Sequence, residues 1–338
     1  MERFHIGEWY GHPFLNLSDQ DRLLLAAHKV GGAAMSKQET KRLENLEQKL
    51  LSTGLTSFEM TRLEALRAKL AIQNEKERPC PFRTDISHPT CTKPGGVCSL
   101  RLYTDAGGSV SPVGGDKGLL RALCPYRFHQ GGVVFSHVGA TLLGDAAPRQ
   151  AAEVGFLEST GNLDSAAGED VGRIDMILVG EAAGEDRFNW AAVEVQAVYF
   201  SGKEMAIEFR HLEKNHGKLS MAQKVRRPDY RSSGPKRLMP QLQIKVPTLR
   251  RWGKKMVVVV DLPFYRSMGH MRVVPHVSNA DIVWCVVDFV EVKTGAYFMI
   301  KVIEEHYTTL ESAIEGLTGG DPVSMEEFEQ RIRVKIGP

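Results

Sequence analysis

The clearest pattern of hydrophobic positions is an internal repeat in residues 36–70, where a 20-residue motif occurs twice. Each copy carries leucines at helical spacing, which are Leu43, Leu46 and Leu50 in the first copy and Leu63, Leu66 and Leu70 in the second. Residues three and four apart share one face of a helix, so the pattern predicts two helices that close as an antiparallel hairpin. The hairpin is either an arm for dimerisation or for clamping DNA, or, as we favour, an insertion packed on the body of the protein.

Both predicted helices begin with a capping box. Ser36 with Glu39, and Thr56 with Glu59, have the spacing in which a hydroxyl and a carboxylate satisfy free amides of the first turn. Gly54 lies between the two copies and marks the turn.

Beyond residue 154 the hydrophobic positions form runs typical of strands. We expect strands at residues 172–179, 191–200, 256–261 and 281–292. Two short acidic helices follow from Thr308, with a break between them at Gly319-Gly320-Asp321-Pro322. This mixture of strands and helices predicts the α/β class. The apolar runs are less than half as long as a membrane span, so we expect no membrane helix.

The charges are sorted along a chain whose net charge is only +2. Residues 214–255 hold thirteen Lys or Arg against one acid, whereas residues 302–330 hold eight Asp or Glu and no Lys or Arg. A basic stretch of one sign favours contact with a polyanion such as DNA, because a solvated surface usually mixes both signs. The candidate phosphate contacts in this stretch are Lys224, Arg226, Arg227, Arg231, Lys236 and Arg237.

Four of the five cysteines, Cys80, Cys91, Cys98 and Cys124, lie within 45 residues. Residues 1–8 lack the basic and apolar regions of an export signal, which predicts a reducing, cytoplasmic location where thiols bind metal rather than form disulfides. Four thiolates would hold iron or zinc in a structural site without an open position. The surrounding Arg101, Arg121 and Arg127 are then candidates for DNA contact, or simply part of a mixed surface. The fifth cysteine, Cys285, sits in an apolar run and is expected to be a buried hydrophobe.

Carboxylates interrupt two of the expected strands. Asp175 stands between Ile174 and Met176, and Glu194 stands between Val193 and Val195, where burial is costly unless the charge is paired or bound to metal. Period-two geometry places Glu194 and Gln196 on one face of the same strand. In hairpin register Asp175 and Glu194 would share one hard cation such as Mg²⁺. The alternative is a buried polar cluster without catalytic function.

These features resemble the NotI-type restriction endonucleases, a branch of the PD-(D/E)-x-K nuclease fold, over roughly residues 80–288. The resemblance rests on Cys-Pro-Phe at Cys80, Gly95-Gly96-Val97-Cys98, Cys124-Pro125-Tyr126-Arg127, Ile174-Asp175 and Glu194-Val195-Gln196. It implies a mixed central sheet flanked by helices, with Asp175 and Glu194 binding Mg²⁺ and the four cysteines binding iron. Gln196 stands where the wider fold has Lys, and this branch is similar in using Glu-x-Gln. The wider fold also has an upstream Glu, for which Glu153 and Glu158 are candidates.

The resemblance further implies homodimers that cleave specific sites in double-stranded DNA, with a cognate DNA methyltransferase as a partner in the same restriction-modification system. Two other functions stay open: a non-catalytic DNA-binding module with a degenerate nuclease core, and a His-Asn-His nuclease. The second has only Asn215-His216 in its favour, and we discount it. We expect five parts: an N-terminal segment at 1–35, the helical hairpin at 36–78, a four-cysteine metal-binding subdomain at 79–150, the nuclease core at 151–300 with the basic insertion 214–255, and acidic C-terminal helices at 301–338.

Overall fold

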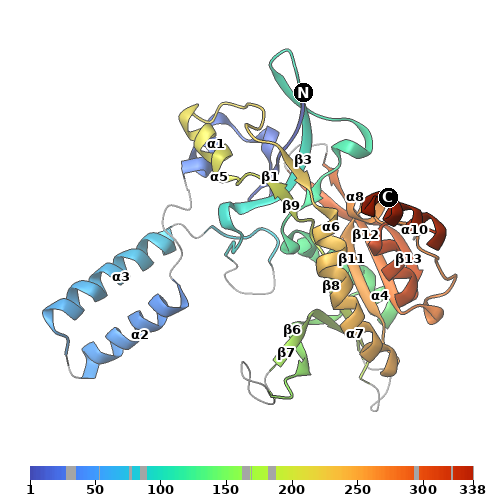
Figure 1. Cartoon of the computed structure of the whole chain (residues 1–338). Coiled ribbons are helices and arrows are strands. Elements are labelled where there is room, and N and C mark those ends of the chain that lie inside the picture. Colours follow the sequence, from blue (N-terminus) through green and yellow to red (C-terminus); the bar gives the residue numbers. More distant parts are fainter. Residues whose placement is uncertain are drawn as a thin grey trace. The chain divides into compact units, whose positions relative to one another are not determined.

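The computed structural model describes residues 1–27, 36–52, 54–75, 78–83, 90–161, 168, 170–181, 188–292, 297–320 and 323–337. Its mixed sheets and helices confirm the predicted α/β class (Figure 1). The chain forms two compact units, of which the first contains residues 1–118, 202–227 and 291–298 and the second contains the remainder. The predicted five-part division and the PD-(D/E)-x-K assignment of the core stay predictions.

An antiparallel sheet organises the first unit. Its strands run in the order β2 (His12–Pro13), β1 (Glu2–Trp9), β3 (Val97–Ala106) and β4 (Ser109–Pro112). The sequence pattern did not predict these strands, because their buried positions include polar side chains. Glu8 and Ser99 are both fully buried, and the Ser99 hydroxyl donates a 2.8 Å hydrogen bond to the Glu8 carboxylate. Helices α1 (Asp19–Ala27) and α5 (Ala206–Lys214) pack together in the same unit.

The predicted helical hairpin is confirmed as α2 (Lys37–Ser52) and α3 (Ser57–Glu75). Four leucines of the repeat are buried between the helices: Leu43, Leu46, Leu63 and Leu66. Both capping boxes form, since the Glu39 carboxylate accepts from the Ser36 amide at 2.8 Å and the Glu59 carboxylate accepts from the Thr56 amide at 3.0 Å. The repeat therefore encodes both the caps and the packed face of the hairpin.

A six-stranded sheet forms the centre of the second unit. Its order is β13 (Phe298–Thr308), β12 (Ile282–Glu291), β11 (Met256–Asp261), β8 (Trp190–Val195), β7 (Asp170–Val179) and β6 (Arg149–Glu158). Strands β8, β11 and β12 are parallel neighbours, whereas β6, β7 and β8 are antiparallel. The predicted strand at 191–200 was too long, because β8 ends at Val195. Strand β6 was missed because most of its residues are exposed and give no apolar pattern.

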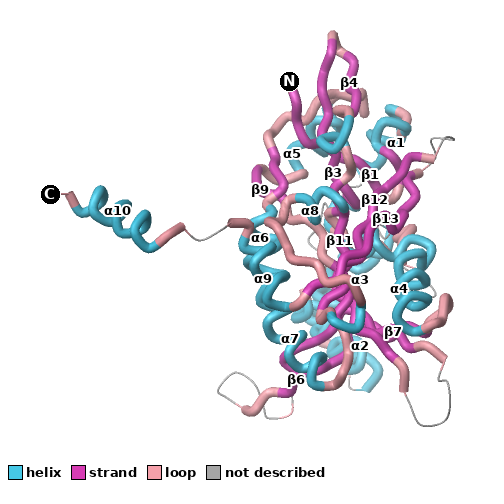
Figure 2. The backbone as a smooth tube through the Cα atoms, turned by 90° about the vertical axis from the view of Figure 1, so that its right-hand side faces the viewer, coloured by secondary structure: helices cyan, strands magenta, loops and turns pink. Residues whose placement is uncertain are grey.

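Helices cover both faces of this sheet (Figure 2). Helix α4 (Val133–Leu143) packs on β7 and β8. On the opposite face, α7 (Met239–Arg251) and α9 (Leu310–Thr318) bury leucines such as Leu242 and Leu317 against Val258 and Trp284 of the sheet. This three-layer arrangement brings α7 close to the strands that carry the predicted carboxylates.

The remaining elements are short or lie at the ends of the chain: β5 (Arg121–Ala122), β9 (Phe200–Gly202), β10 (Arg226–Pro228), α6 (Tyr230–Ser233), a π-helical turn (Gly234–Leu238), α8 (Leu262–Arg266) and α10 (Met325–Ile336). Helices α9 and α10 are the two predicted acidic helices. Gly319 ends α9 with a left-handed φ of 68°, as predicted for the break, and Asp321 and Pro322 lie outside the described residues. Within the described ranges, no helix has the length and apolar character needed to cross a membrane.

Candidate active site

The carboxylates of Asp175 and Glu194 lie side by side on neighbouring strands of the six-stranded sheet. In the antiparallel register of β7 and β8, Met176 faces Val193, so the next pair along is Asp175 and Glu194. The backbone amide of Val195 donates a 3.1 Å hydrogen bond to Oδ2 of Asp175. Asp175 is exposed, whereas Glu194 is only 2% exposed. The predicted hairpin register is therefore present.

The electrostatics of this pair disfavour two negative charges. Burial first and the charge of Asp175 second raise the pKa of Glu194 to about 7, although Lys245 opposes both effects. The pKa of Asp175 is also raised, first because surrounding protein atoms displace water from its carboxylate although the residue stays partly exposed. A divalent cation between the two carboxylates would lower this electrostatic cost, because its positive charge favours the ionised form of both. The carboxylate oxygens of Asp175 and Glu194 thus fit a hard cation, whose other ligands would be oxygens of water or of the substrate.

Lys245 completes the site from helix α7, and the sequence analysis did not single it out. Its Nζ lies 2.7 Å from Oε2 of Glu194 and 2.8 Å from Oε1 of Gln241, and the residue is 6% exposed. The sequence analysis grouped Lys245 with the exposed charges of residues 214–255. A signal was available, because Lys245 lies on the buried stripe of α7 with Leu242, Val246 and Leu249.

Gln196 lies just beyond the end of β8. Its backbone amide donates to the carbonyl of Val259 at 3.0 Å, which continues the pairing with β11. Its side-chain amide donates to the carbonyl of Ala197 at 2.7 Å, and the residue is half-buried. Because β8 ends at Val195, the placement of Gln196 on the same face as Glu194 stays a prediction.

Of the two candidates for the upstream glutamate, Glu153 is the one near the carboxylate pair. Ala152 pairs with Met176 and Val154 pairs with Ile174, so Glu153 stands opposite Asp175 in the ladder of β6 and β7. Its charge contributes to the raised pKa of Asp175. Glu153 also has a left-handed φ of 50°, a backbone conformation that is rare for a residue with a side chain. Glu158 instead pairs with Asp170 at the other end of these strands.

Three of the four clustered cysteines belong to the first unit, near the turn between β1 and β2. The Cys91 amide donates to the carbonyl of Arg78 at 2.8 Å, and Sγ of Cys98 lies 3.5 Å from the carbonyl of Gly96. Tyr10, in that turn, has a pKa raised first by burial and then by Cys91. Cys124 belongs to the second unit. Among the described residues, no three His, Cys, Asp or Glu side chains are arranged to hold a metal, so the four-cysteine site stays a prediction.

Elemental analysis of the purified protein tests that prediction. We expect about one iron or zinc per chain and loss of the metal in Cys98→Ser, because four thiolates must act together. Cys285→Ala is the control, since burial raises the pKa of the Cys285 thiol to about 12 and keeps it protonated in its strand. A folded wild-type protein without iron or zinc, or unchanged metal in Cys98→Ser, would contradict the prediction.

Three arginines predicted to contact DNA are buried in the structure, and their contact with DNA stays a prediction. Arg127 is 0% exposed, lies 4.4 Å from the centre of the Phe289 ring and donates to Gln130 at 2.8 Å. Arg121 is buried and donates to the carbonyl of Leu119. Arg226 is buried in an ion pair with Glu208, whose carboxylate lies 2.7 Å away. Buried charges need such partners, so these three side chains are engaged inside the protein, and a structural role is the alternative to DNA contact.

The other basic candidates are more accessible. Arg101 is half-buried, donating to the carbonyl of Gly118 at 2.6 Å and lying 5.6 Å from the centre of the Phe298 ring. The remaining candidates are exposed, and their contact with DNA stays a prediction; they are Lys224, Arg227, Arg231, Lys236 and Arg237.

Arg226 and Arg227 are neighbours in sequence but differ in burial, which provides a matched pair of variants. Arg227→Ala should weaken DNA binding to all sequences and lower the slope of log affinity against log salt by about one, because one phosphate contact is lost. Arg226→Ala should instead destabilise the fold by about 3–5 kcal/mol, because it leaves Glu208 buried without its partner. Salt-dependent binding and denaturant unfolding of both variants measure these effects. If the slope of log affinity against log salt is unchanged in Arg227→Ala, Arg227 makes no phosphate contact and is only a surface charge.

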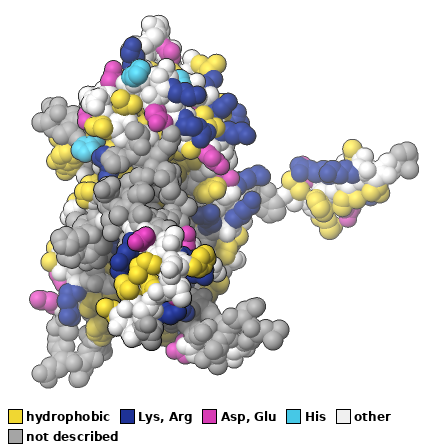
Figure 3. All heavy atoms as spheres, turned by 90° about the vertical axis from the view of Figure 1, so that its left-hand side faces the viewer, with side chains coloured by type: hydrophobic (Ala, Val, Ile, Leu, Met, Phe, Trp, Pro, Cys, Tyr) yellow, Lys and Arg dark blue, Asp and Glu magenta, His cyan; other side chains and the backbone are white. Residues whose placement is uncertain are grey.

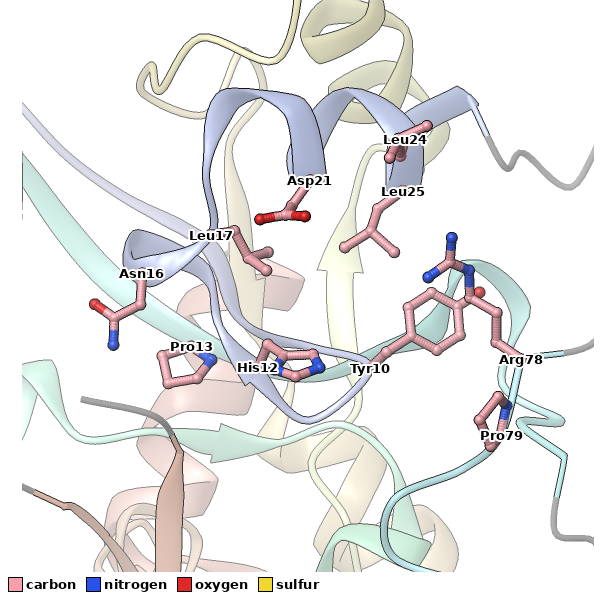
Figure 4. Close-up of a pocket in the computed structure, with 10 residues that line it drawn as sticks. All are labelled: Tyr10, His12, Pro13, Asn16, Leu17, Asp21, Leu24, Leu25, Arg78 and Pro79. Carbon is pink, nitrogen blue, oxygen red and sulfur yellow. The ribbon is translucent and has the colours of Figure 1, made fainter. Parts of the chain in front are cut away.

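A pocket of about 780 Å³ lies in the first unit and does not include the carboxylate pair. Its lining contains Tyr10, His12, Asp21 and Arg78, with apolar side chains from α1 around them (Figure 4). The charge of His12 contributes to a lowered pKa of Asp21, whose main cause is its hydrogen bonds with Ser18. This pocket is separate from the carboxylate pair, which stays the candidate active site.

The comparison with protein families identifies the family of the chain, while the role of the carboxylate pair stays a prediction. The family model for restriction endonuclease NotI matches residues 64–300, a span that contains the carboxylate pair, Lys245 and all four clustered cysteines. The chain belongs to the NotI restriction endonuclease family. A search of curated proteins finds no match. Membership of the NotI family supports a DNA nuclease, and therefore a hydrolase whose substrate is DNA.

Proposed function

We propose that this NotI-family protein is a type II restriction endonuclease that uses Mg²⁺ to cleave phosphodiester bonds at specific sites of double-stranded DNA. The observation that carries the proposal is the carboxylate pair of Asp175 and Glu194, which are adjacent in the sheet, with Lys245 in an ion pair with Glu194. In a protein that only binds DNA, two adjacent carboxylates would be unfavourable, because each raises the free-energy cost of ionising the other and both repel the phosphates of DNA.

Asp175 and Glu194 would hold the Mg²⁺, and water or the DNA phosphate would supply its other oxygen ligands. Glu153 stands opposite Asp175 in the ladder, but the described structure does not arrange the three carboxylates as one metal site. Bound there, the cation would activate a water and neutralise the charge that develops on the scissile phosphate. Lys245 donates a hydrogen bond to the Glu194 carboxylate, which would orient it, and opposes the rise of its pKa. Gln196 offers an amide at the end of β8 to orient the attacking water, but an amide does not accept the proton of that water at neutral pH.

The family further favours a homodimer, in which each copy cuts one strand of the duplex, and a cognate methyltransferase that protects the host DNA. The iron or zinc of the four cysteines would be structural. These finer properties are proposals that depend on the nuclease activity itself.

Digestion of plasmids of known sequence, followed by mapping of the fragment ends, tests the proposal. We expect ends at one short recognition sequence, formed only when Mg²⁺ is present. Tight binding of DNA without any cleavage at millimolar Mg²⁺ would instead support the non-catalytic module.

A further inference from the structure

Helix α10 is amphipathic, and none of its residues is buried against the described part of the chain. Met325, Phe328, Ile332 and Ile336 follow one another at intervals of three and four residues and therefore form one apolar stripe. Their exposed fractions are 69%, 57%, 43% and 75%. The helix at the right of Figure 3 shows hydrophobic side chains gathered along one side. An apolar stripe of this kind in water favours association with a second surface.

The charges of α10 indicate what that second surface is. The first half of the helix carries Glu326, Glu327 and Glu329, and the second half carries Arg331, Arg333 and Lys335. When two copies pack antiparallel along the apolar stripe, the acidic half of each helix faces the basic half of the other. This complementarity occurs at both ends of the pair, whereas a parallel pair would place like charges together.

We propose that α10 is a self-association element that pairs antiparallel with α10 of a second copy of this chain. The pair is two-fold symmetric, because the same surface is used on both copies. Ion pairs within one helix, Glu327 with Arg331 and Glu329 with Arg333, are exposed and contribute little, so they do not compete strongly with pairs between helices. A helix of 12 residues buries less area than a standard interface, so the dimer should have a dissociation constant on the order of micromolar.

This proposal does not rest on the nuclease activity, because it uses neither the carboxylate pair nor DNA. Two other occupants of the stripe are conceivable: the body of the same chain and an unrelated protein. Both would leave the purified protein monomeric, or dimeric through a different surface, and the measurements below distinguish those outcomes.

Sedimentation velocity of the full chain over about 1 to 100 µM tests the proposal. We expect a shift from monomer to dimer with concentration, and at least about a tenfold weaker dimer in Phe328→Glu, which buries a charge in the stripe. Val334→Glu is the matched control, because Val334 is 74% exposed on the opposite side of the same helix and should have no effect. A wild-type protein that stays monomeric, a Phe328→Glu variant that dimerises like wild type, or equal loss in Val334→Glu overturns the proposal.

A charge exchange tests whether the charges of α10 act between two helices. One variant carries Glu326→Lys, Glu327→Lys and Glu329→Lys, so that its helix is entirely basic, and the other carries Arg331→Glu, Arg333→Glu and Lys335→Glu, so that its helix is entirely acidic. Each alone should be monomeric, whereas an equimolar mixture should form a heterodimer, and circular dichroism verifies that both helices persist. Absence of the heterodimer, or dimers of either variant alone, overturns the charge-complementary pairing of α10 while leaving the proposed nuclease function untouched.

Discussion

Glu194→Gln is expected to abolish Mg²⁺-dependent cleavage of DNA while preserving or strengthening DNA binding. The change removes one of the two negative charges that would hold the cation, and it lowers the repulsion between the site and the phosphates. We expect a loss of about 100-fold or more in cleavage rate, because even groups that only support metal ligands contribute 10- to 100-fold. Cleavage rates across a Mg²⁺ titration, together with a DNA-binding assay, measure both effects.

Glu158→Gln is the control for this variant, since Glu158 lies on β6 at the far end of the ladder and its change should leave cleavage unaltered. Gln196→Glu gives a further comparison, because an added charge should increase affinity for Mg²⁺ but lower the rate at saturating metal. Full activity of Glu194→Gln would mean that β8 is not the catalytic strand.

Lys245→Met is expected to lower cleavage by about 100-fold through the orientation of Glu194. Met keeps the length of the side chain but removes the only positive charge that touches the Glu194 carboxylate among the ion pairs of the described residues. Gln196→Lys in the same chain should restore part of the activity, because it returns a positive charge to the end of β8. Gln196→Lys alone should have partial activity at best, since the site already contains Lys245.

The control for Lys245→Met is Lys301→Met, because Lys301 is exposed on β13. Thermal unfolding of each variant separates a loss of fold from a loss of function. A Lys245→Met protein that unfolds at a lower temperature but cleaves at the wild-type rate would make Lys245 purely structural. If Gln196→Lys restores cleavage to the Lys245→Met protein without changing its thermal stability, Lys245 acts by positioning the Glu194 carboxylate.

The sequence predicted those parts of the fold whose buried faces are apolar. Strands β11 and β12 are valine-rich because both faces of the sheet are covered, and the helical hairpin repeats its leucines and caps. Strand β1 was missed because its buried side includes His5 and Glu8, which periodicity arguments read as surface positions. A strand whose buried side chains are polar and hydrogen-bonded therefore lacks the alternating hydrophobic pattern, and that pattern cannot predict it.

The sequence identified those residues of the candidate site that stand out against their immediate neighbours in the chain. A carboxylate between two valines is unusual by itself, so Glu194 was identified without knowing its partners. Lys245 was missed because its partner is distant in sequence and becomes a neighbour only when α7 packs on the sheet. The same limit applies to Arg226, because the chain order does not reveal its buried ion pair with Glu208.

Cleavage of plasmid DNA by wild type and by Asp175→Ala, each with and without Mg²⁺, tests the central claim most directly. Asp175 is exposed, so its replacement should leave the fold intact, which thermal unfolding verifies. We predict that wild type cleaves only with Mg²⁺, and that Asp175→Ala binds the same DNA but does not cleave it at any Mg²⁺ concentration. Cleavage by Asp175→Ala at the wild-type rate, or wild-type cleavage that is independent of divalent metal, would contradict the account.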